Sequence, residues 1–211
     1  NSKFFFEGIW EDPSELGVVE KSPACFLWEN TRIGISAFTL NERVTVGDFF
    51  QNGVITTFHD LSNRTVDELE SDISGWAKTR PISLLIPALY SEFEGDAIPN
   101  IISELRKVPY LDEVIVGLDN ADSEQFTKAR KAFHGLDARC RIIWNDGLRM
   151  RELQKELAQH NLGPLERGKG ANVWYAMGYF LASGRGEVLG MHDADIITYS
   201  RDMLAKLMYP V

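Results

Sequence analysis

From Pro81 to the end of the chain, short apolar runs alternate with segments that carry apolar residues at helical spacing. A short apolar run between turn residues predicts a buried strand, and a repeat of three to four residues predicts an amphipathic helix. Strands that alternate with helices indicate parallel pairing, because a parallel neighbour needs a crossover connection. We therefore expect an α/β domain with a wound, mostly parallel sheet flanked by helices. The strands are expected at 82–86 (stopped by Pro87), 114–118, 141–144 and 188–191, and the helices at 99–108, 122–133, 148–157 and 172–181.

The first eighty residues lack this alternation and are broken by several glycines and prolines. Val54–Phe58 has the composition of a strand. Thr65 and Glu68 fit a capping box that opens a helix to about Lys78. Pro81 then marks a boundary. We expect an irregular N-terminal extension of mixed strand and helix at 1–80, followed by a ligand-binding domain at 81–211.

Composition excludes several classes of partner. The formal net charge of −9 argues against broad binding to nucleic acid or to an anionic membrane. The chain contains no apolar run near the ~20 residues that a membrane span needs. Cys25 and Cys140 are too few for a disulfide framework, so a reducing, cytoplasmic environment is expected. Small-molecule partners fit best, a homodimer is compatible, and an exposed Phe4–Phe6 cluster would suit a protein interface.

The apolar run Val188–Met191 leads into two carboxylates, Asp193 and Asp195, separated by one residue. Residues two apart on a strand point the same way, so both carboxylates should aim beyond the strand at the carboxyl edge of the sheet. Open α/β folds bind ligands at that edge. Two carboxylates there suit Mg²⁺ or Mn²⁺, which in turn can hold a diphosphate. The same pattern also occurs in ordinary turns and helix caps.

Other segments should reach the same edge. Pro87–Glu92 follows the first strand, and Asp119 with Asn120 follows the second. An acidic residue such as Asp119 can accept hydrogen bonds from a base or a ribose hydroxyl. Lys169 lies between two glycines, Gly168 and Gly170, where the backbone can approach a phosphate closely. Considered singly, each segment also has a structural interpretation as a strand end, a capped turn or a solvated turn.

Taken together and in this order, these residues resemble the nucleotide-sugar glycosyltransferases of the GT-A fold, and within them the glucosyl-3-phosphoglycerate and mannosyl-3-phosphoglycerate synthases. Leu84–Glu92 resembles the first strand and the loop that cradles the base. Asp112–Asp119 resembles the second strand and its acidic residue. Gly168–Gly170 resembles the segment near the diphosphate, and His192–Asp195 stands where these enzymes carry a metal-binding Asp-x-Asp. The resemblance covers roughly Pro81 to Val211.

The resemblance implies a GT-A-like fold and a metal-dependent retaining hexosyltransferase. Such an enzyme moves a hexose from a nucleoside-diphosphate sugar, UDP-glucose or GDP-mannose, to a small acidic acceptor such as 3-phosphoglycerate. The metal, Mg²⁺ or Mn²⁺, is assigned to Asp193 and Asp195, and these two residues with Lys169 are the catalytic candidates. The residues assigned to the donor are Pro87, Ala88, Leu89, Glu92, Asp119, Asn120, Gly168, Lys169 and Gly170.

In these enzymes the acceptor site follows the Asp-x-Asp, so we expect residues 81–211 to be a GT-A-like domain that lacks its C-terminal, acceptor-binding part. Two alternatives stay open. One is a sugar-phosphate nucleotidylyltransferase, although the acidic, glycine-free loop 88–94 is unlike the basic, glycine-rich loop of that class. The other is a non-catalytic GT-A-like binding or assembly module.

Overall fold

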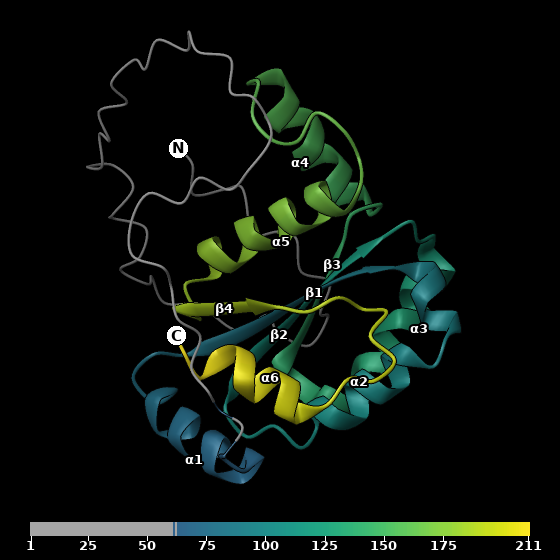
Figure 1. Cartoon of the computed structure of the whole chain (residues 1–211). Coiled ribbons are helices and arrows are strands. Elements are labelled where there is room, and N and C mark those ends of the chain that lie inside the picture. The colour runs from purple at the N-terminus through teal and green to yellow at the C-terminus, as the bar shows by residue number, and fades with distance from the viewer. Residues whose placement is uncertain (1–60, 62) are drawn as a thin grey trace, which may run out of the picture.

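Four parallel strands form one sheet in the order β3-β2-β1-β4 (Figure 1). The computed structural model describes Leu61 and residues 63–211, so Phe4–Phe6, Cys25 and the strand expected at 54–58 lie outside the described residues. The strands are β1 (Ile82–Leu89), β2 (Leu111–Asp119), β3 (Cys140–Trp144) and β4 (Val188–Met191). The predicted fold class, a wound parallel sheet flanked by helices, is confirmed.

Six α-helices surround the sheet in the described part of the chain: α1 (Val66–Trp76), α2 (Ala97–Leu105), α3 (Ser123–Phe133), α4 (Leu148–Gln159), α5 (Lys169–Ser183) and α6 (Arg201–Met208). Two short 3₁₀ helices, η3 (Tyr90–Glu94) and η4 (His134–Arg139), follow β1 and α3. The capping box predicted at Thr65 is present and opens α1, and a second capping box, at Asp122, opens α3. Among the described helices, none combines the length and the apolar character that crossing a bilayer requires.

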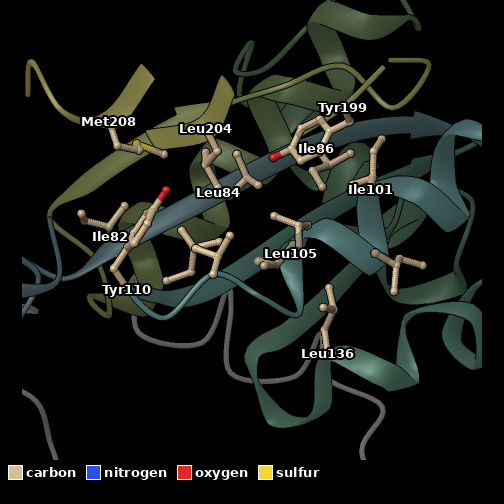
Figure 2. Packing of buried hydrophobic residues seen from close by; sticks show 14 of the residues in the cluster. Ile82, Leu84, Ile86, Ile101, Leu105, Tyr110, Leu136, Tyr199, Leu204 and Met208 are labelled. Carbon is tan, nitrogen blue, oxygen red and sulfur yellow. The ribbon is translucent and has the colours of Figure 1, made fainter. Parts of the chain in front are cut away.

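Alternate residues of the strands feed two separate cores. Leu84 and Ile86 of β1 pack with α1, α2 and α6 on one face of the sheet. Figure 2 shows this core, with Leu204 from α6 on the side of Leu84 and Ile101 from α2 on the side of Ile86. Leu85 points to the opposite face, where α4 and α5 cover the sheet (Figure 1). The alternation follows from the two-residue period of a strand, and it buries β1 on both sides.

Strand β1 is longer than expected. We predicted that it stops at Pro87, but it continues to Leu89, with Pro87 opposite Gly117 of β2. The prediction was wrong because the missing N–H of Pro87 disrupts no ladder. The Leu85 carbonyl accepts from His192 N–H on the β4 side, so Pro87, two residues on, also faces that side, beyond the last paired residue of β4.

Helix α5 begins three residues before its expected start, so Lys169 and Gly170 lie in its first turn instead of in a loop. Gly168 makes this start possible. Its backbone has φ 140° and ψ −173°, a region open essentially to glycine alone. At the other end of the described chain, α1 packs against α6 through the same core that holds Leu84. The division of the chain at residues 80 and 81 stays a prediction.

Candidate donor site at the carboxyl edge

The strand order reverses at β1. The chain steps outward from β1 to β2 and β3, and then returns to the other side of β1 to form β4. The helix that follows β1 and the helix that leads into β4 lie on opposite faces of the sheet (Figure 1). In open α/β sheets, ligands bind at the carboxyl ends of the strands where the order reverses. The segments at this point are η3 after β1, residues 192–195 after β4, and the N-terminus of α5.

These segments bring three carboxylates and one ammonium group together. Lys169 Nζ donates to Asp193 Oδ1 at 2.5 Å. Leu89 N–H donates to Glu92 Oε2 at 2.8 Å, which fixes the Glu92 carboxylate next to the carboxyl end of β1. Burial raises the pKa of Glu92, the hydrogen bond from Leu89 opposes the rise, and the negative charges of Asp195 and Asp193 add to it. The charges of these four side chains therefore act on one another.

The protonation of this cluster follows from its contacts. The hydrogen bond to Asp193 is the main cause that raises the pKa of Lys169, with the charges of Asp193, Asp195 and Glu92 adding to it. Lys169 therefore keeps its positive charge over the physiological range. Both partners of the pair remain about half exposed, with side-chain exposures of 58% and 47%, so an incoming anion can reach the ammonium group.

The cluster suits a divalent cation that a ligand helps to bind. No group of three or more His, Cys, Asp or Glu side chains in the described chain is arranged as a self-sufficient metal site. Mg²⁺-type sites, however, commonly use one or two carboxylates and complete their coordination with water and substrate phosphates. Asp193 and the exposed Asp195 offer such a pair of hard oxygen ligands. The residues present fit a cation of that kind.

A second charged group lies at the ends of β2 and β3. Arg167 Nη2 donates to Asp119 Oδ1 at 2.7 Å and to Asp146 Oδ1 at 2.6 Å. Asp146 Oδ2 also accepts from Ala121 N–H at 3.1 Å. The two carboxylates raise the pKa of Arg167, which holds it as a cation. The loop before α5 is thus tied to the turns that follow two neighbouring strands.

The remaining predicted donor residues divide by exposure. Pro87 and Ala88 are buried inside β1, and Leu89 is exposed at its end. Asn120 is exposed and adopts a left-handed conformation with φ 60°. The structure therefore gathers Glu92, the lysine turn and the Asp-x-Asp at the reversal of the strand order, while Asp119 lies with the Arg167 group. The role of each residue in donor binding stays a prediction.

Three residues of this edge were missed by the sequence analysis: Arg167, Asp146 and Asn172. Asp146 lies two residues after the end of β3, and Asp119 is the last residue of β2, so the strand-end rule could have identified Asp146 as well. Arg167 directly precedes the Gly-Lys-Gly segment, but its sequence context carries no signal of its partners. His192, which directly precedes Asp193, lies with its Nδ1 3.1 Å from the Tyr199 hydroxyl, and burial lowers its pKa.

Comparison with known proteins provides the decisive observation. The chain is 43% identical over 166 residues to glucosyl-3-phosphoglycerate synthase from Persephonella marina, a match that covers 79% of this chain and 41% of that protein. It is 35% identical over 165 residues to the synthase of the same name from Methanococcoides burtonii, covering 78% of this chain and 40% of that one. Over this segment the chain is similar to the glucosyl-3-phosphoglycerate synthases. The resemblance inferred from the sequence is confirmed.

The chain spans about two fifths of the length of these synthases. The similarity also reaches further towards the N-terminus than expected. Residues 81–211 number only 131, so a match over 166 residues of this chain extends well into the region before Pro81. No protein-family model matches the chain.

Among solved structures, a crystal structure of glucosyl-3-phosphoglycerate synthase from Mycobacterium tuberculosis, in complex with Mn²⁺, uridine diphosphate and glucosyl-3-phosphoglycerate, matches 70% of this chain and 43% of its own. Its sequence identity to this chain is 23%, and the TM-score is 0.42.

Proposed function

We propose that this chain supplies the donor-binding part of a metal-dependent, retaining hexosyltransferase that transfers glucose from UDP-glucose to 3-phosphoglycerate. The observation that carries the proposal is the 43% identity to a glucosyl-3-phosphoglycerate synthase, over a segment that folds with an acidic pair and a lysine at the reversal of the strand order. The acceptor would be bound largely by residues outside 81–211, since the relatives are more than twice as long. The cysteine content supports a reducing, cytoplasmic setting.

The charged cluster provides what a departing diphosphate needs. When bound, a divalent cation held by Asp193 and Asp195 neutralises charge that develops on the leaving group. Lys169, protonated and half exposed, can leave Asp193 and donate to a phosphate oxygen. The first N–H groups of α5 can also donate to a phosphate, because the first turn of a helix has N–H groups without intrahelical acceptors. The site would bind the diphosphate more tightly as it departs.

Retention at the anomeric carbon is the expected stereochemical outcome. In this proposal the acceptor hydroxyl attacks from the face that the diphosphate leaves, and a phosphate oxygen of the leaving group takes its proton. Lys169 would hold that phosphate in place, so that the new C–O bond forms while the old one breaks.

The test uses the full-length protein that carries this chain, incubated with Mn²⁺, 3-phosphoglycerate and either UDP-glucose or GDP-mannose. Proton and phosphorus NMR should show glucosyl-3-phosphoglycerate and UDP, with the α configuration of the donor kept. Asp195→Ala should abolish turnover while the protein stays folded. Asp202→Ala, which removes a partly exposed carboxylate on α6 that pairs with Lys206, is the matched control. A folded protein that transfers neither sugar contradicts the proposal. Release of pyrophosphate from UTP and glucose 1-phosphate would indicate a nucleotidylyltransferase instead.

A further inference from the structure

We propose that Asn172 is a positioning residue that holds the Lys169 turn of α5 over the end of β2, and so sets the affinity of the site for a diphosphate. The inference deepens the proposed function and rests on it. In the described part of the chain, the Asn172 side chain forms no hydrogen bond with a charged residue of the cluster. It acts on the site through the backbone that it shares with Lys169.

The contact between Asn172 and β2 is direct and buried. Asn172 is 3% exposed, and its Nδ2 donates to the Gly117 carbonyl at 2.8 Å. Gly117 lies two residues before Asp119, close to the carboxyl end of β2. The amide side chain therefore joins the first turn of α5 to the strand edge where the donor is expected.

Gly117 provides the room for this contact. A Cβ built on Gly117 would lie 1.9 Å from Asn172 Oδ1 and 2.9 Å from its Cγ, and the three nearest atoms all belong to the Asn172 side chain. A separation below 3.0 Å requires a shift of one partner. The amide group thus packs directly against Gly117, and any side chain at position 117 would displace that amide.

The same turn carries the lysine. Asn172 N–H donates to the Gly168 carbonyl at 3.0 Å, which closes the first turn of α5 around Lys169 and Gly170. On the other side of the lysine, Arg167 is held by Asp119 and Asp146. Two contacts with the sheet edge therefore flank Lys169. The contact of Arg167 is exposed, and the contact of Asn172 is buried. Solvent and salt cannot weaken the buried contact of Asn172 with Gly117.

One polar atom of the Asn172 side chain lacks a hydrogen-bond partner in the described structure. Its Oδ1 is buried and has no hydrogen-bond partner among the described residues. An unsatisfied buried acceptor is unfavourable for folding. An apolar side chain would avoid that penalty but would leave the Gly117 carbonyl without its donor, so the amide is explained by the position that it enforces.

The test is a double-mutant cycle on the binding of UDP with Mn²⁺, measured by calorimetry on the full-length protein. Asn172→Ala should weaken UDP binding about tenfold, the usual size of an effect transmitted through a supporting residue. It should leave the affinity for uridine, which lacks the diphosphate, unchanged. In a Lys169→Ala background the same substitution should have almost no further effect, because the group that it positions is gone.

Gly117→Ala provides a second variant that leaves Asn172 in place. The added methyl displaces the amide, so it should weaken UDP binding as Asn172→Ala does, and the double variant Gly117→Ala/Asn172→Ala should be no worse than either single one. Ser183→Ala, which removes a side-chain hydrogen bond to the Phe180 carbonyl at the far end of α5, is the matched control and should not alter UDP affinity.

The outcomes separate the two proposals. If the unaltered protein binds neither UDP nor UDP-glucose with Mn²⁺, the proposed function fails. If it binds UDP but the effects of Asn172→Ala and Lys169→Ala are additive, or uridine binding falls equally, then Asn172 supports the fold in general and the inference is overturned. Circular dichroism of each variant shows whether a loss of binding reflects unfolding.

Discussion

Gly168 and Gly170 flank the same lysine, yet the structure predicts opposite consequences for replacing them with alanine. A Cβ at either position would meet no atom within 4 Å, so crowding does not distinguish them. The backbone does. Gly168 has φ 140° and ψ −173°, whereas Gly170 lies inside the first turn of α5. Any difference between the two variants therefore reports the backbone conformation of each position and not crowding of the added methyl group.

The magnitudes follow from these conformations. Alanine at a position that only glycine occupies freely costs about 1–3 kcal/mol of folding free energy. Alanine in place of a helical glycine stabilises by up to about 1 kcal/mol, since it lowers the entropy lost on folding. We therefore expect Gly168→Ala to be less stable than Gly170→Ala by about 2 kcal/mol or more.

Urea denaturation followed by circular dichroism measures this difference. With a slope of roughly 1–3 kcal/mol per molar urea, the two midpoints should differ by about 1 M, with Gly170→Ala at or above the unaltered chain. Equal midpoints would refute the assignment of Gly168 to a strained helix start. In that case α5 would begin later, near Asn172, and Lys169 would not lie in its first turn.

Three further predictions concern the fold. Glu113 of β2 is 1% exposed, and burial raises its pKa although it accepts a hydrogen bond from Tyr179. Its carboxylate is thus disfavoured in the folded state, so stability should decline as pH rises from about 4.5 through the raised pKa. Glu113→Gln should remove that part of the decline, seen as a smaller difference between unfolding free energies at pH 4.5 and pH 7; an identical pH dependence would contradict it. Thr65→Ala removes the N-cap of α1, where Thr65 Oγ1 accepts from Glu68 N–H at 3.3 Å. It should lower the unfolding free energy by about 1 kcal/mol in urea denaturation. An unchanged unfolding free energy would mean that α1 is held by packing alone. Gly186→Ala would place a Cβ 2.6 Å from both the Phe180 ring and Ser83 Oγ, and should lower stability by about 1–3 kcal/mol in the same assay; an unchanged midpoint would show that this corner is loosely packed.

The order of strands and helices was accessible from the sequence because it depends on local apolar periodicity. The apolar spacing of α2 and the capping box of α1 involve only residues three or four apart. The capping box was predicted where the structure has it, and α2 was predicted at 99–108 but runs over Ala97–Leu105. The end of β1 was not accessible in this way. Whether Pro87 can stay in the strand depends on where β4 stops, about a hundred residues later in the chain.

The positions of the candidate site residues were predictable to the extent that strand ends determine them. Asp119 ends a strand, Asp193 and Asp195 follow one, and parallel strands bring their carboxyl ends to one edge. Arg167 and Asn172 were not predictable because their partners are distant in sequence: Asp119 for the arginine and the Gly117 carbonyl for the asparagine. The glycines around Lys169 also suggested a loop, although one of them starts the helix.

The central claim, that Asp193 and Asp195 hold a divalent cation for the donor diphosphate, is tested most directly by a crystal of the full-length protein grown with UDP and Mn²⁺. Anomalous scattering locates the manganese independently of the protein density. The account predicts a single strong peak at roughly 2.0–2.4 Å from carboxylate oxygens of Asp193 or Asp195 and from UDP phosphate oxygens, with Lys169 moved from Asp193 to a phosphate. Manganese bound between Asp119 and Asp146, or ordered UDP with Lys169 still paired to a metal-free Asp193, would contradict it.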